Sequence, residues 1–365
     1  MSADQKRIVI IGAGFAGAAC AWWLAQKGAK NVVVLEREEM PGLHASGLNA
    51  GMARRFEEDE DIAPLASEGI DFILNPPAGF CDVRLIECNG SLLLNPLLIP
   101  PLKKGGMGGF FKVLKKEDAI QKVPLLSDAK FDNALWTPTD GVIDINAYLW
   151  AFINGAKAGG VKFVMNAKIR AFEVKDNKIS AVITPPFEKG GKGGIYKADI
   201  VINAAGAWAP VIGAMAGAED LKIRSYRRHL YCTPPMPEVD PKWPFVWDIE
   251  NQYYFRPESG GLLLGPADEE ESPPCVPQTN PRIKEVLAEK LMKFCPSLSG
   301  VAIAREWCGL RTFTPDRKPL IRWDKKLKNF FWLTAIGGRG VTCAASAGRV
   351  AASVILSEAK DPAKR

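Results

Sequence analysis

The stretch RIVIIGAGFAGAACAWWLAQKGAKNVVVLE, residues 7–36, decides the fold of this chain. A β-branched run at residues 7–11 predicts a strand, and the small-residue segment at 15–27 predicts a helix. Gly28 follows that segment, and glycine commonly ends a helix. Residues 32–36 form a second β-branched run. The order strand, glycine turn, helix, strand predicts a βαβ unit in a buried parallel sheet.

Three glycines of the turn have the spacing GxGxxG. Gly12 permits the tight turn, Gly14 lets backbone N–H groups approach a pyrophosphate, and Gly17 allows close helix–strand packing. Glu36 ends the next strand, where its carboxylate would bind ribose hydroxyls and disfavour the 2′-phosphate of NADP. The combination predicts a site for NAD or FAD. The alternative is a glycine-rich helix that merely packs on a sheet.

Three further glycine-containing turns favour the larger cofactor. Residues 199–208 read as a strand that ends in a turn at Gly206, and residues 44–51 form a second small polar turn. Near the end of the chain, the strand 330–335 precedes the GGRG turn at 337–340 and a helix at 342–357. A nicotinamide dehydrogenase would not need all of these loops, so they favour FAD.

The middle of the chain alternates helices and strands. A helix is predicted at 145–158, strands at 163–174 and 178–184, and an amphipathic helix at 281–294. This is the pattern of an α/β fold with an antiparallel portion. Two insertions, 100–110 and 185–195, share Pro-Pro followed by GGxGG; we expect solvent-exposed loops, with a phosphate or lipid loop as the alternative.

The composition is that of an ordinary globular protein. Of 365 residues, 47% are apolar and the net charge is +6, which excludes a disordered, coiled-coil or collagen-like chain. No basic stripe with interleaved aromatic residues indicates nucleic acid binding. The eight cysteines form no CxxC pair and the two histidines are far apart, so no metal site is expected. Scattered thiols favour a reducing, cytoplasmic location.

An uncharged run at residues 8–25 has the length of a membrane span or the core of a signal peptide. The three glycines within it favour the βαβ interpretation instead. We therefore expect no membrane span in this chain.

The sequence resembles the D-amino acid oxidase superfamily of flavoenzymes, which includes glycine oxidase and sarcosine oxidase. The resemblance lies in the opening GAGFAG and LERE motifs, in NAAGAW, and in the closing GLRTFTPDRKPLI and FFWLTAIGGRGVT. Within the superfamily, further stretches resemble the bacterial D-arginine dehydrogenase group: NPPAGFC (75–81), TPTDGVIDINA (137–147), YYFRPESGGLLLG (253–265) and WCGLR (307–311).

The resemblance implies a Rossmann-like FAD-binding domain and an antiparallel-sheet substrate domain. It places residues 1–74, 137–224 and 309–365 in the first domain and residues 75–136 and 225–308 in the second. It also implies carboxylate binding by Arg311, Tyr254 and Arg228. The implied FAD-binding residues are Gly12, Gly14, Gly17, Glu36, Arg37, Ser46, Asn49, Ala50, Gly206, Gly337, Gly338, Arg339, Gly340, Val341 and Thr342.

Several positions depart from the dehydrogenase pattern. Ser91 stands where a glutamate pairs with the substrate guanidinium, Met52 replaces a histidine, and Glu57 replaces a gating tyrosine. Arginine is therefore not the expected substrate. Aromatic residues at 245 and 247 would favour an apolar side chain, whereas the arginines at 54 and 55 would favour an acidic one. Cys308 lies near the position of covalent flavin attachment in some relatives, although a buried apolar thiol is the expected state.

The resulting prediction is oxidative deamination of a D-amino acid by hydride transfer to FAD, giving a 2-oxo acid and ammonia. The alternatives are oxidation of sarcosine-like secondary amines or 2-hydroxy acids, and an FAD-binding subunit that is active only in a complex. The expected partner is a small amino-acid-like substrate. Oxygen, a quinone or a redox protein are all open as electron acceptor.

Overall fold

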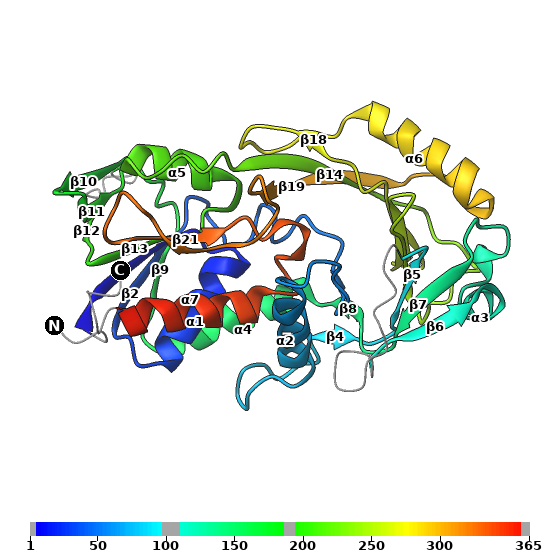
Figure 1. Ribbon diagram of the computed structural model, residues 1–365, viewed down its shortest axis with the longest axis horizontal. Helices are drawn as coiled ribbons and strands as arrows, with labels where there is room; N and C mark the ends of the chain where they lie inside the picture. Colours follow the sequence, from blue (N-terminus) through cyan, green and yellow to red (C-terminus); the bar gives the residue numbers. More distant parts are fainter. Residues whose placement is uncertain (1–4, 97–109, 186–193, 359–365) are drawn as a thin grey trace.

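Two large sheets organise the computed structural model, which describes residues 5–96, 110–185 and 194–358 (Figure 1). The first has six strands in the order β20-β21-β13-β1-β2-β9, parallel except that β20 runs antiparallel to β21. Its strands are β1 (Arg7–Ile11), β2 (Asn31–Leu35), β9 (Lys162–Val164), β13 (Ile200–Asn203), β20 (Leu320–Trp323) and β21 (Phe330–Thr334). Both faces of this sheet are buried, which explains the apolar strand sequences.

Helices and a small sheet cover the two faces of the six-stranded sheet (Figure 1). One face packs against α1 (Phe15–Gln26), α4 (Ile145–Ala158) and α7 (Ala344–Glu358), with α2 (Ala63–Leu74) beyond α7. The other face packs against α5 (Ala209–Ala216) and the sheet β10-β11-β12. The strands of that sheet are β10 (Ala171–Lys175), β11 (Lys178–Ile183) and β12 (Ile195–Lys197). The predicted α/β fold is confirmed.

The second large sheet has nine strands and is antiparallel except for the pair β15 and β5. Its order is β18-β14-β17-β16-β15-β5-β7-β6, and β19 pairs with β14 along nine residues. The strands are β5 (Ser91–Leu94), β6 (Lys112–Lys115), β7 (Asn133–Thr137), β14 (Arg224–Cys232), β15 (Phe245–Asp248), β16 (Tyr253–Glu258), β17 (Gly261–Gly265), β18 (Glu270–Glu271) and β19 (Arg305–Phe313).

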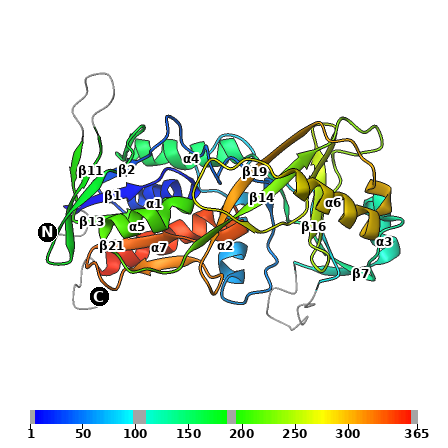
Figure 2. The ribbon, with the colours of Figure 1, turned by 90° about the horizontal axis from the view of Figure 1, so that it is seen from above.

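One face of the nine-stranded sheet packs against α6 (Pro281–Phe294) and α3 (Lys116–Lys122). Figure 2 shows β14 and β19 running from the helical half of the molecule toward the half that carries α6. The remaining sheet is β3-β8-β4, made of β3 (Met52–Ala53), β8 (Gly141–Ile143) and β4 (Ile86–Glu87). The short 3-10 helices are η3 (Pro124–Leu126), η4 (Gly206–Trp208), η5 (Pro296–Leu298) and η6 (Gly337–Arg339).

The structure bears on three further segments for which the sequence made a prediction. The uncharged run at residues 8–25 forms β1, the glycine turn and most of α1, and no helix in the described ranges is long and apolar enough to cross a membrane. The strand predicted at 163–174 is interrupted: its ends belong to β9 and β10, and between them the chain leaves the six-stranded sheet and Asn166 adopts a positive φ of 54°. The glycine-rich cores of the two insertions, 97–109 and 186–193, lie outside the described residues.

The domain boundaries at residues 74, 136, 224 and 308 stay a prediction. The six-stranded sheet takes its strands from residues 7–35, 162–203 and 320–334. The nine-stranded sheet takes its strands from residues 91–137, 224–271 and 305–313.

Candidate active site

The glycine turn between β1 and α1 is fixed by close backbone approach. Gly12 has φ of 103° and donates its N–H to the Leu35 carbonyl at 2.8 Å. A Cβ at Gly12 would lie 2.6 Å from the Ala204 carbonyl oxygen, and one at Gly17 would lie 2.0 Å from the Gly12 carbonyl oxygen. Only glycine fits either position, so the spacing seen in the sequence has the expected steric cause.

The carboxylate of Glu36 lies against this turn, as the spacing predicts. Its Oε2 accepts the Ala13 N–H at 2.7 Å and its Oε1 accepts the Glu38 N–H at 3.0 Å. The side chain is buried but lines the open groove next to the turn. Because each carboxylate oxygen accepts more than one hydrogen bond, Glu36 retains capacity for a ligand hydroxyl.

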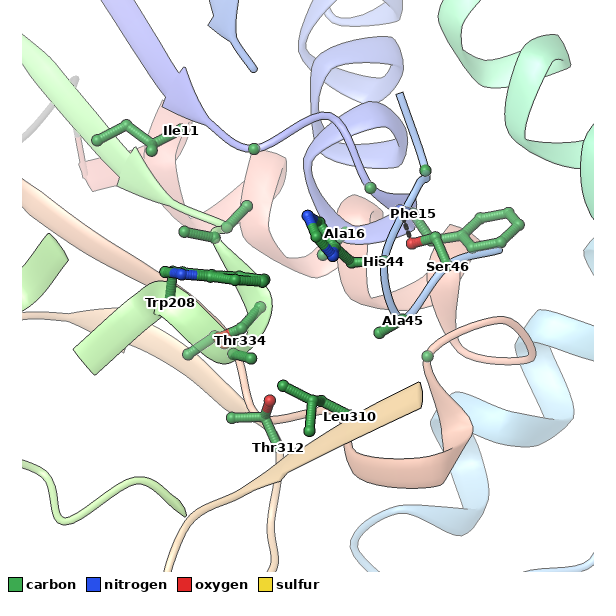
Figure 3. Close-up of a pocket in the computed structure, with 18 of the residues that line it drawn as sticks. Ile11, Phe15, Ala16, His44, Ala45, Ser46, Trp208, Leu310, Thr312 and Thr334 are labelled. Atoms are coloured by element: carbon green, nitrogen blue, oxygen red, sulfur yellow. Dashed lines mark hydrogen bonds between the residues drawn. The ribbon is translucent and has the colours of Figure 1, made fainter. Parts of the chain in front are cut away.

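A groove of about 1590 Å³, measured with its open mouth, runs from the glycine turn to the nine-stranded sheet. Its lining extends from Glu36 and Arg37 beside the glycine turn to Arg311 and Thr312 on β19, so it suits an extended ligand. Figure 3 shows Phe15, Ser46, Trp208, Leu310 and Thr312, from separate parts of the chain, around the same space.

Near Glu36, aromatic and charged side chains enclose one part of the groove. The rings of His44 and Trp208 lie 4.5 Å apart, and the Arg37 guanidinium lies 4.4 Å from the Trp208 ring centroid. Glu38 contacts both side chains, with Oε1 2.7 Å from Arg37 Nε and 2.8 Å from His44 Nε2. His44 and Trp208 are groove residues that sequence reasoning did not assign, although Trp208 lies within the quoted NAAGAW motif.

A second loop follows the groove toward the nine-stranded sheet. Ser46 Oγ accepts the Phe15 N–H at 3.1 Å, which ties this loop to the start of α1 (Figure 3). Asn49 donates to the Ser46 carbonyl at 2.6 Å and accepts the Gly51 N–H at 2.7 Å. The Ala50 carbonyl accepts from Arg256 Nε at 2.7 Å, which joins the loop to the large sheet.

The turn after β21 forms the opposite wall. Gly337 has φ of 62°, and a Cβ there would lie 2.5 Å from the Phe313 ring. Gly338 and Gly340 have open space where a Cβ would project, and both line the groove. Arg339 instead turns to Glu57, with Nε and Oε2 2.5 Å apart. This turn therefore offers the groove backbone rather than side chains.

Arg311 is a buried cation at the edge of the groove. Its guanidinium donates to the Leu48 carbonyl at 3.0 Å and to the Leu310 carbonyl at 3.1 Å, and it pairs with no carboxylate among the described residues. Burial lowers the pKa of Arg311 to about 10, so the side chain is charged at neutral pH. Gly309 leaves room for it, because a Cβ there would lie 2.9 Å from Arg311 Nη1.

Tyr254 and Arg228, to which the resemblance assigns the same carboxylate, lie near Arg311. Arg228 on β14 is directly opposite Gly309 on β19, so Arg228 and Arg311 are diagonal neighbours on one face. Burial raises the pKa of Tyr254, while the charges of Arg228 and Arg311 oppose that rise. Arg228 Nη2 also donates to Glu269 at 3.0 Å, an acid that the sequence analysis did not connect with it.

Most of the proposed cofactor residues line this one groove. They are Gly12, Gly14, Glu36, Arg37, Ser46, Asn49, Gly206, Gly337, Gly338, Gly340 and Val341. Gly17, Ala50, Arg339 and Thr342 lie behind its surface, Gly17 in helix–strand packing and Arg339 in its ion pair. Sequence reasoning also missed the segment 167–169, which enters the groove because the expected strand breaks at Asn166.

The positions that depart from the family pattern lie in different surroundings. Ser91 is buried and donates to Asp140 at 2.6 Å. Phe245 is 1% exposed within an apolar cluster, so the predicted aromatic wall consists of Trp247 without it. The Arg55 side chain is also buried and pairs with Asp71, which removes it from the proposed acid-binding pair.

The thiol of Cys308 is buried and does not line the groove. Burial raises its pKa to about 11, so the thiolate is disfavoured. This is the state expected of an apolar cysteine.

Comparison with known proteins matches this architecture to a family. The model of the DAO family, described as FAD dependent oxidoreductase, matches residues 7–354. The human mitochondrial dimethylglycine dehydrogenase is 27% identical over 97% of this chain and 43% of its own length. The 4-methylaminobutanoate oxidase (formaldehyde-forming) of Paenarthrobacter nicotinovorans is 25% identical over 96% of this chain and 44% of its own length. The chain thus spans less than half the length of these relatives.

A solved structure shares the whole architecture. The L-proline dehydrogenase from P. horikoshii superposes with a TM-score of 0.81 and 25% sequence identity, covering 97% of this chain and 94% of that one. With the family model matching nearly the entire chain and the groove built as described, this chain belongs to the DAO family of FAD-dependent oxidoreductases.

Proposed function

We propose that this chain oxidises a small amine that carries a carboxylate group, using FAD held in the groove. The observation that carries the proposal is Arg311, a buried guanidinium at the groove edge that no described carboxylate neutralises. An isolated buried cation is costly, and a bound anion removes that cost. A planar guanidinium is also the side chain best suited to hold a carboxylate through two hydrogen bonds.

The residues of the groove fit FAD. The glycine turn at the start of α1 provides backbone N–H groups and a helix N-terminus for the pyrophosphate. Glu36 would accept from the ribose hydroxyls, and Ser46, Asn49 and the turn 337–341 would surround the flavin. When bound, FAD supplies the two-electron acceptor for the oxidation, which protein side chains do not provide.

The contribution of the protein is mainly orientation. Arg311 would bind the carboxylate. The Tyr254 hydroxyl and Arg228, which lie near Arg311, would donate further hydrogen bonds to the same carboxylate. Fixing the carboxylate also fixes the carbon next to the amine, and correct placement of reacting groups accounts for a large part of many rate enhancements. That carbon loses a hydride, the resulting iminium takes up water, and a carbonyl compound and an amine leave.

Two classes of amine fit this chemistry. A secondary or tertiary amine is supported by the relatives, whose names give dimethylglycine, 4-methylaminobutanoate and L-proline as their substrates. A D-amino acid is supported by the sequence motifs that resemble the D-arginine dehydrogenase group. The two classes differ in which carbon is oxidised, and both require a neutral amine and an anchored carboxylate.

The test is an anaerobic visible spectrum of the purified protein, recorded with sarcosine, dimethylglycine, L-proline, single D-amino acids and 2-hydroxy acids. We expect the oxidised-flavin band to bleach with an amine-bearing carboxylate, and the member that bleaches it fastest identifies the class. Bleaching by a hydroxy acid alone would overturn the proposal. A band that persists with every compound until a co-purified protein is added would instead indicate a subunit that works only in a complex.

A further inference from the structure

Arg54 forms a second cationic position beside the carboxylate-binding residues. Its guanidinium lies 4.5 Å from the centroid of the Trp247 ring, and that ring lies 4.9 Å from the ring of Tyr254. Arg54 follows β3, whose Met52 packs in the same apolar cluster as Tyr254 and Trp247. One aromatic ring therefore separates Arg54 from the residue that we place on the substrate carboxylate.

The charge of Arg54 is only partly neutralised. Its Nε and Nη2 reach Glu57 at 3.3 and 3.4 Å, which is long for a charge-assisted hydrogen bond. Glu57 lies much closer to Arg339, whose Nε is 2.5 Å from Glu57 Oε2. No described residue accepts from Arg54 Nη1. The Glu57 carboxylate thus contacts two guanidinium groups, and its contact with Arg339 is the shorter one.

The neighbouring arginine does not share this position. Arg55 turns the other way, where it donates to Ser67 Oγ at 2.7 Å and to Asp71 at 2.6 Å with its side chain 1% exposed. Its backbone N–H donates to Asp140 at 2.8 Å. These contacts anchor the segment and leave Arg54 as the one arginine of the pair that faces Trp247.

Arginines also outnumber their acidic partners around Arg228 and Arg311. Glu269 is shared by Arg228 and Arg317, at 3.0 and 2.9 Å, as Glu57 is shared by Arg54 and Arg339. Arg311 has no acidic partner in the described chain. One substrate carboxylate on Arg311 would therefore leave the charge of Arg54 compensated only in part, by the Glu57 carboxylate that it shares with Arg339. The apolar alternative is weaker, since Arg54 lies over the Trp247 ring and Phe245 is buried.

We infer that Arg54 determines specificity for substrate charge: the substrate is an amine with two carboxylates, one bound by Arg311 and the other by Arg54. This inference rests on the proposed function and narrows its substrate class. The second carboxylate can belong to the side chain of an amino acid, as in aspartate, or to a substituent on nitrogen, as in N-carboxymethylglycine. Both place a second anion a few bonds from the amine, which is the chemistry that Arg54 recognises.

The experiment compares matched substrates by the rate of anaerobic flavin bleaching. The pairs are D-alanine with D-aspartate, D-norvaline with D-glutamate, and sarcosine with N-carboxymethylglycine. We expect the wild type to favour the dicarboxylate of at least one pair. Arg54→Met should lower kcat/KM for that dicarboxylate about 10- to 100-fold, the loss of one charge-assisted hydrogen bond, and change the neutral partner less than about 3-fold.

Two control variants make the result specific. Arg54→Lys retains the charge and should lie between the wild type and Arg54→Met with the dicarboxylate. Arg84→Met removes a charge from an arginine whose side chain is 75% exposed and should change neither rate. An equal loss for both members of a pair in Arg54→Met, or a wild type that favours the neutral members throughout, would overturn the inference.

A binding measurement separates this inference from the proposed function. Glutarate and butyrate are unreactive and differ by one carboxylate, and each can be titrated through its effect on the flavin spectrum. Tighter binding of glutarate that Arg54→Met abolishes supports the second anion site even if no amine bleaches the flavin. Equal binding of the two acids would overturn the second anion site. If amines with a single carboxylate still bleached the flavin, the proposed function would stand without it.

Discussion

Replacement of Arg311 by methionine tests the proposed anchor with little change of shape. Methionine is unbranched and of similar length, so the variant removes the guanidinium and its hydrogen bonds to Leu48 and Leu310 without opening a large cavity. The neighbouring Gly309 leaves room for an unbranched side chain. We expect the fold and the FAD content to be retained, because the groove is lined mainly by other residues.

The size of the effect follows from burial. Removing one partner of a buried ion pair costs about 3–5 kcal/mol, which corresponds to roughly 150- to 5,000-fold in kcat/KM. Arg311 is 8% exposed and would form such a pair with the carboxylate, so this range applies. The assay is stopped-flow flavin reduction at several substrate concentrations, with the ratio of flavin to protein absorbance as the measure of cofactor content.

Arg224→Met is the matched control. Arg224 lies on β14, is exposed and pairs with Glu271, so its loss should leave kcat/KM unchanged. A loss of less than about 5-fold in Arg311→Met, with the wild-type FAD content, would refute the assignment of Arg311 as the carboxylate anchor. A similar loss with a carboxamide substrate would also refute it, because a neutral amide does not form the ion pair.

Three further perturbations follow from the structure. Gly14→Val should purify with little FAD and a normal circular dichroism spectrum, since even a Cβ would lie 2.8 Å from Ser46 Oγ; full FAD content would contradict this. Glu269→Gln should lower KM for a carboxylate substrate about 3- to 10-fold, because Arg228 loses its acidic partner, and an unchanged KM would speak against a role for Arg228. Burial raises the pKa of Asp140 from 3.8 to about 7, so the folded chain binds a proton that the unfolded chain has lost by pH 7. The free energy of unfolding should therefore fall by about 4 kcal/mol between pH 4 and pH 8 relative to Asp140→Asn, and parallel pH profiles for the two proteins in denaturant titrations would disprove it.

The βαβ unit could be predicted from the sequence because its signals are local. The glycine spacing, the two β-branched runs and the acid at Glu36 all fall within residues 7–36, and the structure places them as expected. Helices α4 and α6 were predicted with the bounds observed, since each has a clear apolar period between end signals. The glycine turns predicted that a large cofactor binds, but the sequence alone does not show how these turns come together to form the groove.

The missing parts of the site depend on long-range contacts. Trp208 contacts Arg37 and His44, which lie more than 160 residues earlier in the chain, and no local sequence pattern predicts that contact. Glu269 is 41 residues from Arg228, so the basic cluster around Arg228 in the sequence does not predict this ion pair. The adjacent residues Arg54 and Arg55 were equivalent in the sequence and point to different surroundings in the fold.

The most direct test of the account uses one amine in two forms, the free carboxylic acid and its carboxamide. The acid is the member that bleaches the flavin fastest in the anaerobic panel. Both forms have the same amine and the same oxidisable carbon, so they differ in the group that Arg311 is proposed to hold. We predict rapid anaerobic bleaching by the acid and bleaching at least about 100-fold slower by the amide, the cost of losing a buried charge pair. Equal rates for the two forms would contradict the central claim that this site recognises an amine through its carboxylate.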